Sequence, residues 1–295
     1  NDLTGLRGGA GGCFTPFVAE TRSSAELTAT LKDFAGGQFN TGPPAPMTTE
    51  ATPGGSTVAP GTAQHDVATL TAAGSRPVPT GTVKFFLCQP AQVTGAGCPT
   101  GGTQIGTPAA GETVSGGVAT SEETTNDTTP GKDCWRAEYP PDTAGSAYYL
   151  PSTHTNATTE CFTVAHASPT ITTQIAVTGA NAPGLGFTTL GDTATLHDFV
   201  PGTVTGDTVD FNLYDVTAHP GCTGSAVFHT TGTLNASGVA TTSATYNPTA
   251  AHTYVWIASY AGDSFNDPAS GSCSESNEPA TLWGAQSAVP KLANP

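Results

Sequence analysis

Charged residues are scarce in this sequence. They make up 11% of its 295 residues, and eight Lys and Arg stand against 23 Asp and Glu, which leaves a formal net charge of −15 at pH 7. Such a chain repels the phosphates of nucleic acids and the surface of anionic membranes, so we expect neither as a partner. No stretch approaches the roughly 18 consecutive apolar residues of a membrane span. We therefore expect no membrane insertion.

Enzyme motifs are also missing. The sequence contains no nucleophile elbow, HExxH zinc helix, phosphate-binding loop or dinucleotide-binding turn. His197 and Asp198 are adjacent, but neighbouring side chains of an extended strand point to opposite faces and do not form a catalytic pair. We expect no catalytic residues and no cofactor, and hence a protein that is not an enzyme.

Metal-binding patterns are equally absent. The cysteines form no CxxC pairs and no Cys/His clusters of the kind that bind zinc. Two acidic groups, Asp263 with Asp267 and Asp207 with Asp210, resemble fragments of a calcium site. Calcium takes about six to eight oxygen ligands, and neither group offers a complete loop. We interpret both groups as polar turns and expect no metal site.

What is abundant points to an all-β fold. The chain has 36 Gly and 24 Pro, and Thr is very common. Thr is β-branched and suits a pleated, half-exposed surface, while Gly and Pro end short strands at turns. Aromatic and β-branched residues recur in alternation, which is typical of strands rather than of a disordered chain.

The chain also repeats itself. Residues 66–70 (DVATL) reappear 126 positions later as residues 192–196 (DTATL), and residues 82–87 reappear as 208–213. Further on, Trp135 and Tyr139 correspond to Trp256 and Tyr260, now 121 positions apart. A register held over about 100 residues indicates two copies of one domain.

Each copy contains seven short strand-like runs separated by turn signals. This is the sequence signature of an immunoglobulin-like β-sandwich. We expect an N-terminal β segment at 1–46, sandwiches at 47–165 and 166–284, and a tail at 285–295. The expected strands are 47–52, 67–72, 82–88, 102–108, 118–122, 134–139 and 161–164 in the first module, and 171–177, 193–197, 208–214, 226–234, 239–246, 252–260 and 280–283 in the second.

The second module resembles the bacterial immunoglobulin-like repeats of secreted and cell-surface proteins. The resemblance rests on residues 206–211 (GDTVDF), 237–241 (SGVAT) and 260–265 (YAGDSF), the last being typical of that family's final hairpin. The first module is similar at 80–86 (TGTVKFF), but its 139–142 (YPPD) departs from the Gly-Asp turn. The resemblance implies an immunoglobulin-like sandwich and a role as spacer, stalk, adhesin module or wall-associated structural protein.

Seven cysteines indicate disulfides in an oxidising, extracellular compartment. By position we pair Cys88 with Cys98 across a loop and Cys134 with Cys161 between the last two strands of the first module. Four cysteines in one module nevertheless allow three pairings. Cys222 and Cys273 then form the pair of the second module, and Cys13 is left over.

The N-terminal segment contains two strand-like runs, at 13–20 and 25–34. An isolated two-stranded hairpin is marginal in water, so it is expected to pair with something else. One interpretation is that Cys13 belongs to a third module that lies outside this sequence. The other is that the segment adds its strands to a sheet edge of a second copy, head to tail, with Cys13 locking the joint. The expected intersubunit contacts are Cys13, Phe14, Phe17, Leu27, Leu31 and Phe34.

Carbohydrate is another candidate partner. A Trp can stack on a saccharide, but Trp135 and Trp256 lie beside Tyr139 and Tyr260 on alternating strands, which favours packing in the core. Asn126, Asn156 and Asn235 are formal glycosylation acceptors.

Taken together, these patterns predict an extracellular structural protein at the cell surface, either a stalk or the subunit of a self-assembling filament. Two alternatives stay open. The chain is an adhesin or carbohydrate-binding module with a cell-wall or glycan ligand, or it is an accessory region of a larger secreted enzyme.

Overall fold

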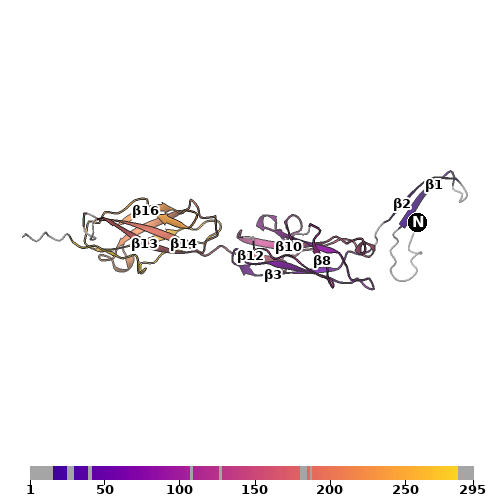
Figure 1. Ribbon diagram of the computed structural model, residues 1–295, viewed down its shortest axis with the longest axis horizontal. Coiled ribbons are helices and arrows are strands. Elements are labelled where there is room, and N and C mark those ends of the chain that lie inside the picture. Colours follow the sequence, from indigo (N-terminus) through magenta and orange to yellow (C-terminus); the bar gives the residue numbers. More distant parts are fainter. Residues whose placement is uncertain are drawn as a thin grey trace, which may run out of the picture. The chain divides into compact units, whose positions relative to one another are not determined.

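The computed structural model describes residues 16–24, 30–38, 42–106, 109–125, 128–179, 185–186 and 188–284 (Figure 1). These residues are nearly all strand, turn or irregular chain, which confirms the predicted all-β class. Their helical parts are short 3₁₀ turns: η2 (Pro90–Gln92), η3 (Gly145–Ala147) and η4 (Pro220–Cys222). No helix among the described residues is long and apolar enough to cross a membrane. The chain divides into two compact units, Asn1–Ala165 and His166–Pro295.

The first unit contains a sandwich of two sheets. The three-stranded sheet has the order β3-β5-β9, and the larger sheet has the order β4-β12-β10-β6-β7, with β8 paired to β6 and β11 paired to β10. Neighbouring strands are antiparallel except β4 and β12, which run parallel. The strands are β3 (Met47–Thr52), β4 (Thr57–Val58), β5 (His65–Leu70), β6 (Thr82–Cys88), β7 (Thr103–Ile105), β8 (Glu112–Thr113), β9 (Val118–Thr120), β10 (Gly131–Tyr139), β11 (Ser152–His154) and β12 (Cys161–Val164).

The second unit repeats this plan. Its smaller sheet has the order β13-β14-β17, and its larger sheet has the order β16-β15-β18-β19, with β20 also paired to β18. This strand order corresponds to that of the first unit, and both fit an immunoglobulin-like sandwich. The strands are β13 (Thr170–Gly179), β14 (Thr188–His197), β15 (Thr208–Asp215), β16 (Phe228–Thr233), β17 (Val239–Thr241), β18 (Thr253–Tyr260), β19 (Ala269–Ser270) and β20 (Ala280–Thr281).

Alternation along the strands forms each core. Every second residue of β6 and of β15 points inward, and Phe85 and Phe211 at the middle of these strands are both fully buried. Each such side chain contributes about 1.5–3 kcal/mol by leaving water. The apolar residues that the repeat keeps are therefore the residues that fill the two cores.

One expected strand of the second unit is shorter than the sequence suggests. We expected a strand over 239–246, but β17 ends at Thr241. Beyond it the Thr242 N–H donates to the Asp192 carbonyl in one sheet, while the Ser243 N–H donates to the Thr231 carbonyl in the other. The chain therefore leaves the three-stranded sheet at this point. The apolar alternation of the sequence continues although the strand has ended.

The N-terminal segment forms a hairpin. β1 (Pro16–Arg22) and β2 (Leu31–Gln38) pair antiparallel, with an irregularity at Thr21 and Arg22. Together they make a two-stranded sheet of their own. The described residues of both strands thus pair with each other and with no strand of either sandwich.

Candidate functional site

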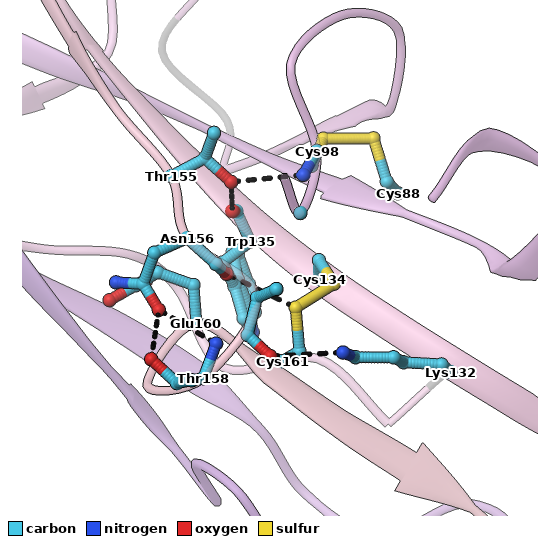
Figure 2. Close-up of a disulfide and its surroundings, with 12 residues drawn as sticks. Cys88, Cys98, Lys132, Cys134, Trp135, Thr155, Asn156, Thr158, Glu160 and Cys161 are labelled. Atoms are coloured by element: carbon cyan, nitrogen blue, oxygen red, sulfur yellow. Dashed lines mark hydrogen bonds between the residues drawn. A yellow bond between two sulfur atoms is a disulfide. The ribbon is translucent and has the colours of Figure 1, made fainter. Parts of the chain in front are cut away.

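All three disulfides that the cysteine positions predict are present, and two of them lie together in the first unit (Figure 2). Cys134 and Cys161 face each other across β10 and β12 with 4.0 Å between their Cα atoms, and Cys88 bonds to Cys98 across a short loop. The four cysteines form one buried cluster. Thr155 connects its two halves, because its hydroxyl accepts the Cys98 N–H and donates to the Trp135 carbonyl.

The second unit has a single disulfide, which closes a longer stretch of chain. Cys222 in η4 bonds to Cys273 in the loop after β19, across 51 residues of sequence. Three disulfides in one chain fit a secreted protein in an oxidising compartment. Cys13 lies outside the described residues, so its partner stays a prediction.

The two tryptophans of the repeat are core residues. Trp135 on β10 and Trp256 on β18 are both fully buried, and Trp256 packs edge-on against Phe211 with 6.2 Å between ring centroids. A fully buried indole has no face available to a saccharide. The adhesin alternative therefore loses the aromatic pair on which the sequence could base it.

The most unusual chemistry of the molecule is a pair of buried carboxyl groups in the first unit. Asp66 is the second residue of β5, Glu160 directly precedes β12, and both residues are fully buried. Burial and the charge of Glu160 both raise the pKa of Asp66, which places the two carboxyl groups close together. A hydrogen bond between them would require a proton on one of them. Among the described residues no donor has good hydrogen-bond geometry to either Asp66 oxygen, although the backbone N–H groups of Val67 and Glu50 lie close by.

The second unit contains the same arrangement. Asp192 on β14 occupies the repeat position of Asp66 and is 2% exposed, and Glu278, which precedes β20, is fully buried. The Asp192 Oδ1 accepts the Thr193 N–H at 2.8 Å, while Oδ2 and both oxygens of Glu278 have no partner of good geometry among the described residues. Each sandwich thus places one carboxyl on the strand that pairs with its first strand and another just before its last strand.

Burial raises the pKa of all four groups above their ordinary values. Desolvation, followed by the charge of Glu160, raises the pKa of Asp66 to about 8. Desolvation, followed by the charge of Glu278, raises the pKa of Asp192 to about 8. Desolvation also raises the pKa of Glu160, and it raises that of Glu278 to about 7. A carboxyl group in an apolar interior is more stable as the neutral acid.

A threonine of the first strand adjoins each pair. Thr49 on β3 hydrogen-bonds His154 on β11, with 2.7 Å between Oγ1 and Nδ1, and also hydrogen-bonds Glu160. Thr173 on β13 donates both its N–H and its hydroxyl to Glu275. The pairs are therefore alike in strand position but different in surroundings.

The side chains of the two acidic turns that resemble fragments of a calcium site are hydrogen-bonded to protein groups. Asp263 Oδ1 accepts the N–H groups of Phe265 and Asn266 at 2.6 and 2.8 Å, and Asp207 accepts the Tyr260 hydroxyl at 2.9 Å. No cluster of three or more His, Cys, Asp or Glu within the described ranges has the geometry to bind a metal. The other acidic and histidine residues singled out in the sequence also contact protein groups. Asp210 contacts His229, Asp267 contacts Ser168 and His166, and His197 contacts Thr172.

The structure places the other predicted residues as follows. The Asn156 amide Nδ2 donates to Thr159 at 2.7 Å, so a glycan there would have to replace this hydrogen bond, whereas Asn235 lies in an exposed turn. Phe17 lies on β1, and Leu31 and Phe34 lie on β2. The described ranges do not include Asn126, Cys13, Phe14 and Leu27.

Comparison with known proteins adds little. No family model matches the chain, and no curated protein matches it. Among solved structures, the chain is similar to the cryo-EM structure of the native conformation of E. coli alpha-2-macroglobulin, with 12% sequence identity and a TM-score of 0.25. The match covers 93% of this chain and 19% of that chain, so the present chain spans about a fifth of the macroglobulin's length. A likeness this slight carries no argument about function.

Proposed function

We propose that this protein is an extracellular structural protein, the subunit of an assembly in which the N-terminal hairpin of one copy adds to a sheet edge of the next. In this role the sandwiches supply length and surface and perform no catalysis. The observation that carries the proposal is the pairing of the hairpin: among the described residues, β1 and β2 pair with each other only.

The two sandwiches support a load-bearing role. Each has its own apolar core, built around Trp135 in one case and Trp256 in the other. Each also carries at least one disulfide between distant parts of its chain, which limits how far it extends once it unfolds. Modules that fold and are cross-linked separately suit repeated arrays outside the cell.

The sheets offer open edges for the added strand. Within the described ranges, β3 and β13 each pair with one strand only, β5 and β14 respectively. An exposed edge presents unpaired N–H and C=O groups, and a two-stranded hairpin gains stability by joining a larger sheet. A contact between the hairpin of one copy and the module of the next does not close on itself, so it produces a filament.

Electron microscopy tests this directly. Full-length protein and a variant that lacks residues 1–41, and so keeps the contacts of residues 43–46 with the first sandwich, are concentrated in parallel and imaged in negative stain. We expect filaments from the full-length protein only, because the variant keeps both sandwiches but has no donor strand. Full-length protein that stays monomeric at high concentration would contradict the proposal.

The role of Cys13 needs its own test. We expect disulfide-linked oligomers of the wild type on non-reducing gels, and their loss in Cys13→Ser. Filaments that persist in Cys13→Ser would show that strand pairing alone holds the joint. A wild-type monomer with three internal disulfides and one free thiol would show that Cys13 links no subunits.

A further inference from the structure

We propose that each sandwich contains an acid-stabilised lock, in which a buried Asp–Glu pair retains a proton in the folded state and makes the module less stable as the pH rises. The first lock is Asp66 with Glu160, and the second is Asp192 with Glu278. The device is intrinsic to the sandwich and holds whether or not the protein assembles.

The position of the pair makes it a lock between the ends of the module. Asp66 on β5 lies opposite Ala51 of β3, the first strand, and Glu160 leads into β12, the last strand. Asp192 lies opposite Ile175 of β13, and Glu278 leads into β20. The pair therefore joins the sheet that holds the first strand to the strand that closes the sandwich.

The surroundings of the pair favour neutralisation by a proton over neutralisation by a basic side chain. No Lys or Arg of the described residues forms an ion pair with any of the four carboxyl groups. The other titratable groups near the first pair include Glu50 on β3, His65 on β5 and His154 on β11. Asp133 on β10, the strand beside β12, is also fully buried. At the second pair a further acid, Glu275, adds negative charge. Two carboxylates without a cation are too costly to bury, and one proton removes most of that cost.

A bound metal ion is the other way to neutralise such a pair. The clusters of described residues offer too few ligands for this, as noted above. Duplication of the pair in both modules, with different neighbours, also argues against a dedicated metal site. His154 lowers the pKa of Glu160 in the first module, whereas Glu275 raises that of Asp192 in the second.

The sign of the pH effect follows from the raised pKa values. In the unfolded chain these groups ionise near pH 4, whereas burial raises the pKa of Asp66 and Asp192 in the folded protein to about 8. Between these limits the folded state binds more protons than the unfolded state. The lock is thus fully present below about pH 4 and is lost as the pH rises through about 8. For one proton, the unfolding equilibrium constant rises up to tenfold per pH unit.

Urea unfolding of the full-length chain between pH 4.5 and 8 tests the proposal. We expect the wild type to become less stable with pH, and Asp66→Asn to remove this dependence from the first module only, with Asp192→Asn doing the same in the second. Glu50→Gln, which neutralises an exposed acid on the neighbouring strand, is the matched control and should keep the wild-type dependence. Equal pH dependence in wild type and both Asp variants would overturn the proposal.

A measurement on the wild type covers the case in which an Asn variant fails to fold. Infrared spectra in D₂O distinguish a protonated carboxyl from a carboxylate. We expect the protonated band to persist in the folded protein at pH 6 and to disappear on unfolding. Its absence from the folded protein would refute the lock. Appearance of the band only after EDTA is added, or a fall in stability with EDTA at constant pH, would show that a metal ion neutralises the pair instead.

Discussion

The two modules share a sandwich but are held together differently. The first has two adjacent disulfides and a short strand, β4, that runs parallel to its last strand, β12. In the second, the described residues include no counterpart of β4, and the one disulfide closes a loop of 51 residues. The buried carboxyl pair is present in both. The sandwich therefore requires its core and tolerates different cross-links. The carboxyl pair recurs in both modules together with the core.

Removing the central phenylalanine of either core should have the largest effect. Phe85→Ala and Phe211→Ala each delete a fully buried ring from an equivalent strand, and each should destabilise its own module by about 3–5 kcal/mol. Amide hydrogen exchange resolves the two modules in the intact chain. If Phe85→Ala lowers the protection of the second module equally, the cores are not independent.

Removing the disulfides sharpens the contrast between the modules. The loops that they close contain 10, 27 and 51 residues for Cys88–Cys98, Cys134–Cys161 and Cys222–Cys273. Because each disulfide lowers the entropy of the unfolded chain, we expect them to add about 2.7, 3.5 and 4 kcal/mol to the free energy of unfolding, in that order. Double Cys→Ala variants and urea unfolding measure each value. A second module that is indifferent to loss of its disulfide would show that its loop is already restrained without it.

Two corresponding turn glycines should respond alike. Gly117 and Gly238 have φ values of +85° and +73°, and an added Cβ would lie 2.7 Å from the Leu70 carbonyl oxygen and 2.5 Å from a Phe199 ring atom. Replacement by Ala should cost about 1–3 kcal/mol through strain and crowding. Gly116→Ala is the control, because its φ is also positive but nothing lies within 4 Å. Equal losses of stability for Gly116→Ala and Gly117→Ala would show that backbone strain alone sets the cost and that crowding adds nothing.

The smallest expected effect is a shift in the pH at which each lock is lost, caused by a neighbouring titratable group. Glu275 raises the pKa of Asp192, whereas His154 lowers that of Glu160. Glu275→Gln should therefore shift the pH response of the second module downward, and His154→Gln should shift that of the first upward, each by less than about one pH unit. Stability curves against pH measure both shifts. Shifts in the same direction would mean that other groups dominate.

Much of the fold was predictable from the sequence, because it depends on local alternation and on the repeat. Val83, Phe85 and Leu87 alternate inward as their counterparts Val209, Phe211 and Leu213 do. The three disulfides were predictable from cysteine position. The end of β17 was not, because Thr242 and Ser243 change hydrogen-bonding partners while the apolar alternation continues.

The carboxyl pair was missed for a physical reason. Acidic residues are almost always exposed, so a lone Asp or Glu in a strand pattern is read as a surface position. Asp66 and Asp192 did stand at the head of the repeated block, which was the available signal. Their partners Glu160 and Glu278 lie far along the chain in stretches that do not align, and only the folded sandwich brings them together.

Carboxyl titration by ¹³C NMR tests the central claim most directly, since it observes the groups themselves. In the full-length protein, with Asp66→Asn and Asp192→Asn used to assign the signals, one aspartate in each module should titrate near pH 8. If every aspartate and every glutamate titrates below about pH 5, close to the ordinary range, the pairs are ionised in the folded state and the lock does not exist.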